Sequence, residues 1–286
     1  MTGLGPTLLR GAAASPFKRP GRPGAVLPAT RLSRPAAPVA AAPLARYRQI
    51  CRFPATGPLP LTYPHVAAFP LAMRLMTARA FPLPVLGLVH TWIEITSHRP
   101  VRADEALGLT VYAQSLEPHR RGTEVTVVTE ARVAGEPVWE SRSGYLARHP
   151  VRGAAPAPET SAPETSAPET SAPALPAVAE WRLPGDLGRR YGSASGDRNP
   201  IHLHPLTARL FGFPRPIAHG MWTVARCLAE VEGAEHVRSL RARFRAPVPL
   251  PGTVTYAADG SGTAFELRGG PDGERIHLTG SVTRDV

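Results

Sequence analysis

The sequence predicts an α+β fold made of two similar units, each with one buried helix packed on an antiparallel sheet. Three observations support this fold class. A low-complexity repeat divides the chain, the two flanking segments share one order of patterns, and each begins with an apolar helix followed by alternating strands. Consecutive strands after a helix pair through hairpins rather than βαβ crossovers, which favours an antiparallel sheet. The chain of 286 residues, 43% hydrophobic, is long enough for two such units.

The boundary between the units is a repeated pentapeptide. APETS occurs three times from Ala157 to Ser171 and is followed by Ala-Pro. Proline, serine, threonine and glutamate without a large apolar residue bury too little surface to offset the entropy of ordering. We therefore predict an extended linker over residues 153–177, between an N-terminal unit at 45–152 and a C-terminal unit at 178–286.

Each unit begins with an apolar stretch that has helical character. In the N-terminal unit this stretch covers residues 63–80, and alternating runs such as TEVTVVTEARVAG follow it. In the C-terminal unit, residues 217–233 place apolar side chains at helical spacings of three and four on more than one face. A helix that is apolar around most of its girth belongs in a core, and we expect Gly233 to stop it.

Residues 1–44 form a basic tail rich in proline, arginine and alanine. The first 50 positions hold eight basic residues and no acidic residue, so the net charge of +11 falls to about +3 for the remainder. No basic helix interleaved with aromatic residues follows, which argues against a nucleic-acid partner. Prolines at positions 6, 16, 20 and 23 interrupt any amphipathic targeting helix. We expect a disordered tail, with a cleaved targeting segment as the less favoured alternative.

The cysteines and the hydropathy of the chain indicate the cellular location that we expect. Cys51 and Cys227 lie far apart and match no metal or redox spacing, which fits a reduced, cytoplasmic location. The sequence has no run of about 18 apolar residues, so we expect no membrane span.

The most informative stretch is YGSASGDRNPIH, residues 191–202, which GFPRPIAHGM follows at 212–221. Its polar residues cluster around a turn that Pro200 stiffens: Tyr191, Ser195, Asp197, Asn199 and His202. The combination resembles the signature of the MaoC-like dehydratases, whose best-known members are the (R)-specific enoyl-CoA hydratases. This resemblance implies a double hot-dog fold, in which each unit wraps an antiparallel sheet around a long central helix. Because the N-terminal unit lacks the motif, we expect it to be non-catalytic and to form a wall of the acyl tunnel.

The motif residues suggest acid–base chemistry on water. Asp197 and His202 are the Asp/His pair in a tight turn beside a predicted buried helix. The resemblance implies that both act on one water, with Asp197 orienting it and His202 exchanging its proton, because an imidazole titrates near neutrality. Asn199 either holds this turn closed or forms an Asx turn before Pro200, and the two roles are compatible.

Gly220 lies at the expected start of the C-terminal helix. Backbone N–H groups there lack intrahelical partners, and the helix dipole adds positive potential. We therefore expect Gly220 to receive the thioester oxygen as negative charge develops on it; close packing of a small residue is the alternative. His219 either caps the helix or lines the pocket, and Tyr191 and Ser195 are further candidates for substrate contact.

Metal and cofactor chemistry is not expected. His202 and His204 form a His-x-His pair, but no carboxylate or cysteine cluster completes a ligand set. Instead, His204-Pro205 is expected to open a short helix over residues 205–211.

A third pattern concerns charge on a strand. Arg241, Arg243 and Arg245 alternate along one predicted strand and share one of its faces. They either attract the phosphates of coenzyme A or an acidic acyl carrier protein, or they form an ordinary solvated strand face.

The resemblance, together with the motif residues, implies reversible syn hydration of trans-2-enoyl thioesters to (R)-3-hydroxyacyl thioesters in fatty-acid or polyketide-type metabolism. The expected substrate carrier is coenzyme A or acyl carrier protein, and the chain is expected to act as a monomer or a homodimer. A hot-dog acyl-thioesterase is the first alternative, but it needs a polar group on the central helix, which offers only Glu230 and Glu232 at its far end. A non-catalytic acyl-thioester-binding subunit is the second, and the intact motif argues against it.

Overall fold

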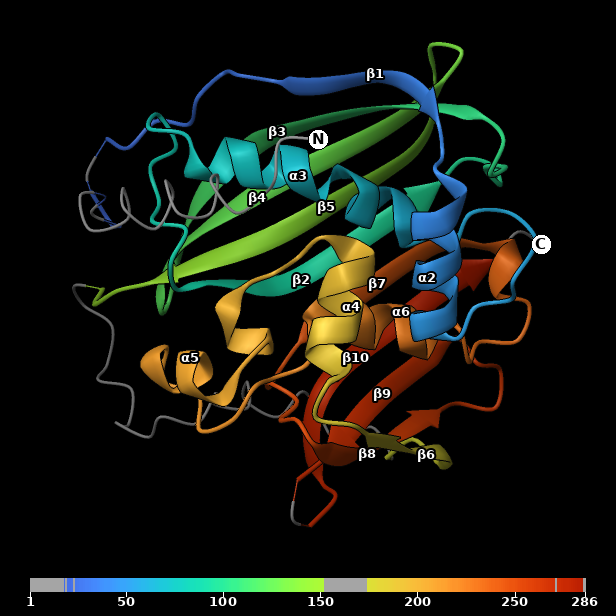
Figure 1. Cartoon of the computed structure of the whole chain (residues 1–286). Helices are drawn as coiled ribbons and strands as arrows, with labels where there is room; N and C mark the ends of the chain where they lie inside the picture. The colour runs from blue at the N-terminus through green and yellow to red at the C-terminus, as the bar shows by residue number, and fades with distance from the viewer. Residues whose placement is uncertain (1–17, 19, 23, 152–173, 271, 285–286) are drawn as a thin grey trace.

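The computed structural model describes residues 18, 20–22, 24–151, 174–270 and 272–284 (Figure 1). Its α-helices are α2 (Ala41–Cys51), α3 (Tyr63–Thr77), α4 (Leu187–Ser195), α5 (Pro205–Leu210) and α6 (Gly220–Leu228), and its short 3-10 helices include η2 (Pro200–His202) and η3 (Ala234–His236). The strands of the N-terminal unit are β1 (Leu32–Pro38), β2 (Leu88–Ser97), β3 (Ala106–His119), β4 (Gly122–Val133) and β5 (Glu136–Arg148). Those of the C-terminal unit are β6 (Ala177–Leu183), β7 (Val237–Phe244), β8 (Gly252–Ala258), β9 (Ala264–Gly269) and β10 (Arg275–Arg284).

Within the described residues, ten strands form one antiparallel sheet in the order β1-β3-β4-β5-β2-β7-β10-β9-β8-β6. Each unit contributes five strands in the same internal order. The strand before the central helix lies at the outer edge, and the strand after that helix lies in the middle of the sheet. The predicted similarity of the two units is therefore confirmed by their topology, with β1 corresponding to β6 and β2 to β7.

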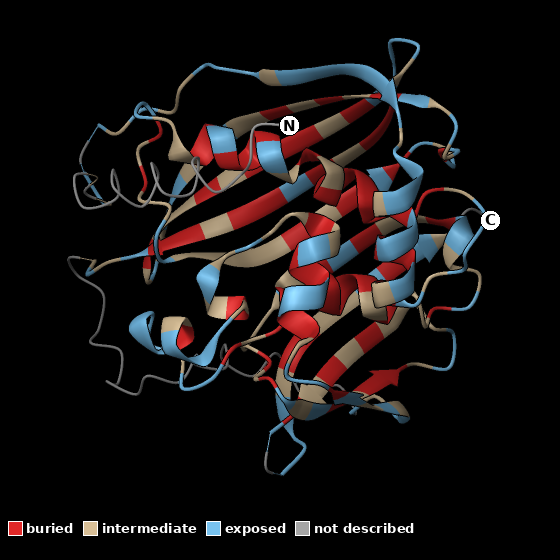
Figure 2. Ribbon diagram, in the orientation of Figure 1, coloured by how far each residue is buried: buried red, intermediate tan, exposed pale blue. Residues whose placement is uncertain are grey.

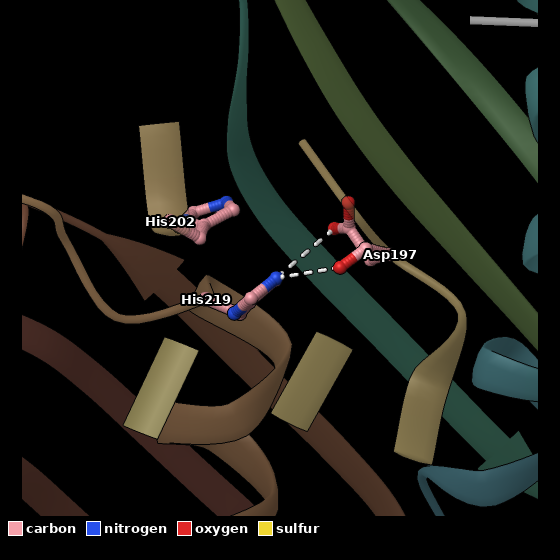
Figure 3. A group of neighbouring side chains, drawn as sticks. All are labelled: Asp197, His202 and His219. Carbon is pink, nitrogen blue, oxygen red and sulfur yellow. Dashed lines mark hydrogen bonds and ion pairs between the residues drawn. The ribbon is translucent and has the colours of Figure 1, made fainter. Parts of the chain in front are cut away.

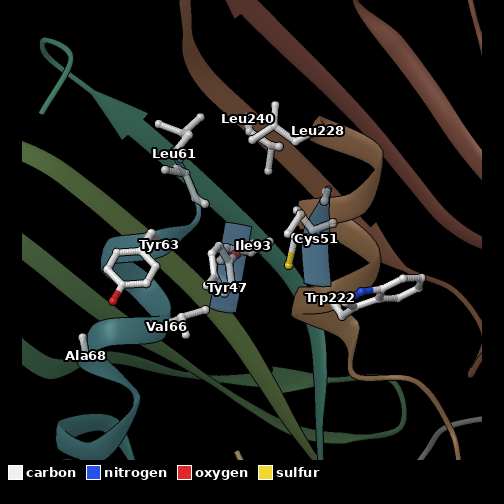
Figure 4. Packing of buried hydrophobic residues seen from close by; sticks show 14 of the residues in the cluster. Tyr47, Cys51, Leu61, Tyr63, Val66, Ala68, Ile93, Trp222, Leu228 and Leu240 are labelled. Carbon is white, nitrogen blue, oxygen red and sulfur yellow. The ribbon is translucent and has the colours of Figure 1, made fainter. Parts of the chain in front are cut away.

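The two units meet at β2 and β7, which pair antiparallel with Ile93 opposite Ala242 and Ile95 opposite Leu240. All four side chains are buried. One apolar cluster extends across this seam and joins α2, α3 and α6, as Figure 4 shows. The two units therefore share one hydrophobic core instead of having a separate core each.

The strands alternate between buried and less buried positions along their length, as expected for a sheet covered on one face (Figure 2). The helices lie on this covered face, in front of the sheet in Figure 1. None of the described helices is both long and apolar enough to cross a membrane.

The central helix of the C-terminal unit is shorter than predicted at both ends. It covers Gly220–Leu228 instead of 217–233. Ile217 pairs with Pro249 in a β-bridge, and the Ala218 N–H donates to the Val248 carbonyl at 2.8 Å, so the chain stays extended up to His219. The expected stop at Gly233 is wrong: this residue adopts a left-handed φ of 64° in the turn that leads into η3. The helical spacing of apolar residues does not reveal that the backbone at Ile217 pairs in a β-bridge instead of continuing the helix.

The prediction of a disordered tail through residue 44 is wrong for its last part. Leu32–Pro38 form β1, which pairs with β3 at the edge of the sheet, and α2 begins at Ala41. Only Leu32 is partly buried in β1 and the other positions are exposed, so no hydrophobic alternation marks this strand. Residues 1–17 and the APETS repeat lie outside the described residues.

Helix α2 supports the catalytic unit although it belongs to the N-terminal part of the chain. It packs against α4 and α6, and the Trp222 indole N–H donates to the Ile50 carbonyl at 3.0 Å. Tyr47, which is fully buried, shares a 2.8 Å hydrogen bond with Thr62 and lies beside Tyr191 of α4. The layer α2–α4–α6 thus forms a continuous base beneath the motif turn.

Candidate active site

The motif turn lies directly against α4 because two glycines on that helix allow close approach. A Cβ at Gly188 would lie 1.9 Å from the His202 carbonyl oxygen, and one at Gly192 would lie 2.7 Å from the Asp197 carbonyl oxygen. Both contacts are with backbone, so a side chain at either position would push the turn away from the helix. The spacing of four places the two glycines on one face of α4. This glycine pair was not predicted from the sequence.

The turn itself is held by short local hydrogen bonds. α4 ends at Gly196, which has a left-handed φ of 80°. The Ser195 hydroxyl donates to the Tyr191 carbonyl at 2.9 Å and accepts the Asp197 N–H at 3.2 Å. The Asn199 N–H donates to Asp197 Oδ1 at 3.1 Å, while Asn199 Oδ1 accepts the Ile201 N–H at 3.4 Å and caps η2. Ser195 and Asn199 therefore shape the turn, and the Asx-turn interpretation of Asn199 describes its side chain.

Asp197, His202 and His219 converge at the end of this turn (Figure 3). Each offers one polar atom, and these atoms all lie within 4.8 Å of one another. The rings of His202 and His219 stack with their centroids 3.7 Å apart. Both histidines are buried, at 8% and 2% exposure, whereas the Asp197 side chain keeps 26% of its surface open to solvent. A water at the Asp197 carboxylate can therefore be reached from outside and contacted by the imidazole.

His202 is oriented as a base. Its Nδ1 lies 2.8 Å from the Ile217 carbonyl oxygen, which can only accept, so Nδ1 carries the proton and Nε2 presents a lone pair. Burial lowers the pKa of His202 below its usual 6.5, although the charge of Asp197 and the bond to Ile217 raise it in part. The ring is thus neutral at neutral pH and able to take a proton.

Burial raises the pKa of Asp197 above 3.8, while His202 and the Asn199 N–H act in the opposite direction. Burial therefore brings the two pKa values closer together, because it raises that of Asp197 and lowers that of His202. A carboxylate and a neutral imidazole whose pKa values lie closer together are suited to moving a proton through one water.

His219 forms the floor of the site. Its Nε2 lies 3.0 Å from the Asp197 carbonyl oxygen and 3.9 Å from Oδ2, and its ring packs against Tyr191 at 4.8 Å. Burial and neighbouring His202 lower the pKa of His219 well below its usual value. The neutral ring has one proton, and the bond to a carbonyl places it on Nε2. Its Nδ1 is buried without a partner among the described residues.

The same proton argument bears on metal binding. Asp197, His202 and His219 lie close enough together to be considered as ligands of one metal ion. However, the His219 nitrogen that faces Asp197 carries a proton, and only two ligand atoms remain, fewer than a stable site uses. The arrangement suits proton transfer better than coordination. His204 lies apart from this group and caps α5 by accepting the Leu206 N–H at 3.2 Å, as expected for the start of a short helix.

Gly220 begins α6, as the oxyanion expectation requires. His219 is the N-cap in extended conformation, and the Gly220 N–H has no hydrogen-bond partner among the described residues. A Cβ at this position would lie 2.8 Å from Cε1 of Phe244 on β7. The absence of a side chain thus lets the helix start pack against Phe244, while the N–H of Gly220 stays free of an intrahelical partner.

The N-terminal unit contributes aromatic residues that the motif did not reveal. His90 on β2 stacks on Tyr145 of β5 and packs on Phe244 of β7, with centroids 4.6 Å apart in both pairs. Burial, with a further contribution from the charge of Asp197, raises the pKa of Tyr145. His65 on α3 stacks on His90 with centroids 6.1 Å apart, and its Nδ1 lies 3.0 Å from Ser141 Oγ. No spacing in the sequence links strands that meet only in the folded sheet.

The three strand arginines are not brought into this site. Phe244 faces the helix layer, so its neighbours on β7 point to the opposite face of the sheet. Arg241 is 74% exposed there and pairs with Glu94 at 3.4 Å, and Arg243 is also exposed. Arg245 follows the strand, where its N–H donates to the His277 carbonyl. Arg241 and Arg243 thus lie on a solvated strand face, which was the second of the two alternatives for these residues.

Two surface hollows in the described part of the chain also lie away from the three converging residues. One, of about 410 Å³, lies at the surface where α2 meets α4 and is lined by Arg46, Arg189 and Arg190. The other, of about 250 Å³, lies near Trp139, Val231 and Val237. The acyl tunnel expected beside the N-terminal unit therefore stays a prediction.

Comparison with known proteins agrees with the motif and the fold. Residues 169–266 match the family model for the MaoC-like domain. The chain is 36% identical over 230 residues to 3-hydroxyacyl-thioester dehydratase X of Mycobacterium tuberculosis, and the match covers 79% of each protein. The crystal structure of HtdX from Mycobacterium tuberculosis superposes with a TM-score of 0.74 at 32% identity, covering 90% of this chain and all of that one.

A second solved structure bears on the fold alone. Rv0216 of Mycobacterium tuberculosis, described as a double hot-dog, has a TM-score of 0.51 at 14% identity, with 91% of this chain and 98% of that one covered. A double hot-dog with an Asp/His turn packed against the start of its second central helix defines a hydratase-type protein. The chain belongs to the MaoC-like dehydratase family. The predicted family and fold class are confirmed.

Proposed function

We propose that this protein is a hydro-lyase that reversibly adds water to trans-2-enoyl thioesters and forms (R)-3-hydroxyacyl thioesters. The observation that carries the proposal is the convergence of Asp197 with the lone pair of His202 Nε2, beside the N–H of Gly220. A 36% identical relative that carries the name of a 3-hydroxyacyl-thioester dehydratase supports the substrate class.

In the hydration direction, one water supplies every atom that is added. Asp197 accepts a hydrogen bond from the water, and His202 Nε2 removes a proton as the oxygen attacks C3 of the enoyl group. Negative charge moves to the thioester oxygen, where the Gly220 N–H and the positive end of α6 stabilise it. His202 then returns the proton to C2, and both additions occur on the same face because one catalytic group serves both.

This reaction needs no electron acceptor, and we propose that it needs no cofactor or metal. One site per chain is complete in itself, so a monomeric double hot-dog suffices. The carrier of the acyl group is coenzyme A or an acyl carrier protein, since the reacting atoms lie on the acyl side of the thioester.

Thioester hydrolysis on this fold is less well supported. It requires a polar group positioned at the carbonyl by the central helix. Glu230 lies beyond the end of α6 and is paired with Arg226 one turn earlier. No carboxylate lies on α6 itself, Gly220–Leu228. The catalytic groups instead come from the turn before it.

The test is a steady-state assay with crotonyl thioesters of coenzyme A and of acyl carrier protein. Loss of the enoyl ultraviolet absorbance, with chiral analysis of the product, should report (R)-3-hydroxybutyryl thioester, and dialysis against a chelator should leave the rate unchanged. Asp197→Asn and His202→Ala should each reduce turnover by about 10²- to 10⁴-fold, whereas the exposed control variants Asp104→Asn and His236→Ala should not. Release of free thiol instead of hydration would show a thioesterase and overturn the proposal.

A further inference from the structure

Helix α5 presents an exposed apolar surface, here called the α5 patch, which consists of Leu206, Leu210 and Phe211. These side chains are 64%, 83% and 41% exposed. Six large hydrophobic residues are exposed in the described part of the chain, and three of them fall within this six-residue segment. Leu206 and Leu210 are separated by four positions and share one helix face. Such clustering is typical of an interaction surface rather than of scattered exposure.

The segment that carries the α5 patch is rich in exposed arginines and poor in acidic residues. Between residues 187 and 220 the only acidic residue is Asp197, which belongs to the catalytic group. Five arginines in the same segment are exposed, and four of them form what we call the arginine rim: Arg189, Arg198, Arg209 and Arg215; the fifth, Arg190, lines the hollow between α2 and α4. Within the described residues none of the four pairs with a carboxylate, in contrast to Arg99 with Glu105 or Arg142 with Glu140 elsewhere.

Three of the four rim arginines are held by backbone carbonyls without being neutralised. Arg189 donates to the Leu203 carbonyl at 3.3 Å, Arg209 to that of Pro214 at 3.4 Å, and Arg215 to that of Pro251 at 3.3 Å. A carbonyl carries no net charge, so each guanidinium keeps its positive charge for an external partner. The rim therefore favours a negatively charged surface.

The α5 patch is joined directly to the catalytic turn. α5 follows η2, which ends at His202, after two residues. The Thr207 hydroxyl donates to the Pro200 carbonyl at 2.7 Å, and Ala208 is fully buried against the body of the protein. Figure 1 shows α5 projecting beside the turn, and Figure 2 shows it largely exposed. A partner bound here would hold its cargo close to His202.

We propose that the α5 patch and the arginine rim dock an acidic acyl carrier protein that delivers the acyl thioester to Asp197 and His202. The proposal rests on the hydro-lyase function and names the carrier for the same site. A second copy of this chain is disfavoured, because a two-fold contact would place basic rim against basic rim. An anionic membrane is also disfavoured, because six residues of helix offer little apolar area for insertion.

The experiment compares one enoyl group on two carriers. Crotonyl-acyl carrier protein presents the docking partner, while crotonyl-pantetheine carries the same reacting atoms without protein or phosphate. The test variants are Arg209→Glu/Arg215→Glu and Leu210→Ser. The matched control is Arg241→Glu/Arg243→Glu, which makes the same change of charge on the opposite face of the sheet. Melting temperatures verify folding, and titration of each variant with apo-acyl carrier protein measures docking without catalysis.

For both test variants we expect kcat/KM on the carrier-protein substrate to fall about ten-fold or more, with binding of the apo-carrier weakened in parallel. The rate on crotonyl-pantetheine should stay within about two-fold, because only docking is lost. Rising salt should reduce the carrier-protein rate of the wild type more than that of the arginine variant.

Three results would overturn the proposal: unchanged carrier binding in the test variants, equal losses on both substrates, or the larger loss in the Arg241/Arg243 control. Patch-dependent binding to anionic vesicles without binding to the carrier protein would assign the surface to a membrane instead. If the wild type hydrates neither substrate, the proposed function fails, and the apo-carrier titration still decides whether the surface docks a carrier.

Discussion

The ring of His219 stacks on that of His202 at 3.7 Å, and its Nε2 holds the Asp197 carbonyl oxygen at 3.0 Å. One neutral side chain therefore touches both members of the catalytic pair, although it lies 22 and 17 residues from them in the sequence. It fixes the backbone of Asp197 and one face of the His202 ring. His219 is thus a positioning residue whose effect is exerted through its neighbours.

Replacement of His219 should lower kcat more than it raises KM. His219→Phe keeps a flat ring but loses the N–H donor, so Asp197 can shift, and a shift of about 1 Å can cost on the order of 10²-fold in rate. His219→Gln can still donate from a similar reach and should recover part of the loss. Stopped-flow or steady-state kinetics on a crotonyl thioester, with melting temperatures, check this. Equal activity of the Phe and Gln variants would show that the donor is not used.

Asp197 and His202 should behave as one unit. If both act on a single water, removing either disables that water, and a second removal adds little. Asp197→Asn, His202→Ala and the double variant should therefore show losses in kcat of similar size, rather than losses that multiply. The measurement is a double-mutant cycle on kcat/KM. Multiplicative losses would indicate that the two residues act on separate steps.

The local parts of the fold and the site could be predicted from sequence, and the long-range parts could not. Asp197, Asn199 and His202 lie within six residues, so one motif contains their geometry. The packing of Phe244 against Gly220 joins positions 24 residues apart, and His90 reaches the site only because β2 pairs with β7. Such contacts follow from sheet topology, which alternation of apolar residues does not specify. The same reason explains why β1 was missed, since an exposed edge strand has no buried face.

Gly220 should tolerate alanine poorly and valine not at all. A Cβ at 2.8 Å from Phe244 Cε1 forces the ring or the start of α6 to move, which displaces the N–H from the thioester oxygen. We expect kcat of Gly220→Ala to fall about ten-fold, with a smaller change in substrate affinity, because the donor acts mainly in the transition state. Phe244→Leu in the same chain should restore part of the rate by making room. Normal turnover by folded Gly220→Val would place the oxyanion donor elsewhere.

Deletion of β1 should destabilise the N-terminal unit, in contrast to what a disordered tail implies. Leu32 pairs with Val111, and the strand covers the outer edge of β3. Without it, unpaired N–H and C=O groups of β3 become exposed, which promotes aggregation. A chain lacking residues 1–40 should melt about 5 °C or more below one that lacks residues 1–30. Light scattering and thermal melts compare the two deletions, and identical melts would show that β1 contributes nothing.

Acidification should unfold the protein through its buried neutral histidines. Burial lowers the pKa of His65 to about 4 and that of His90 to about 3, against an ordinary value of 6.5 in the unfolded chain. Below pH 6.5 these two histidines bind protons in the unfolded state but stay neutral in the folded state. Stability is therefore fully present above pH 6.5 and is lost toward pH 4, by about 1.4 kcal/mol per pH unit for each such group. His65→Asn, which keeps an amide near Ser141, should flatten this dependence in urea melts of the variant and the wild type between pH 7 and 4.5. An unaltered slope in His65→Asn would show that His65 does not titrate with unfolding.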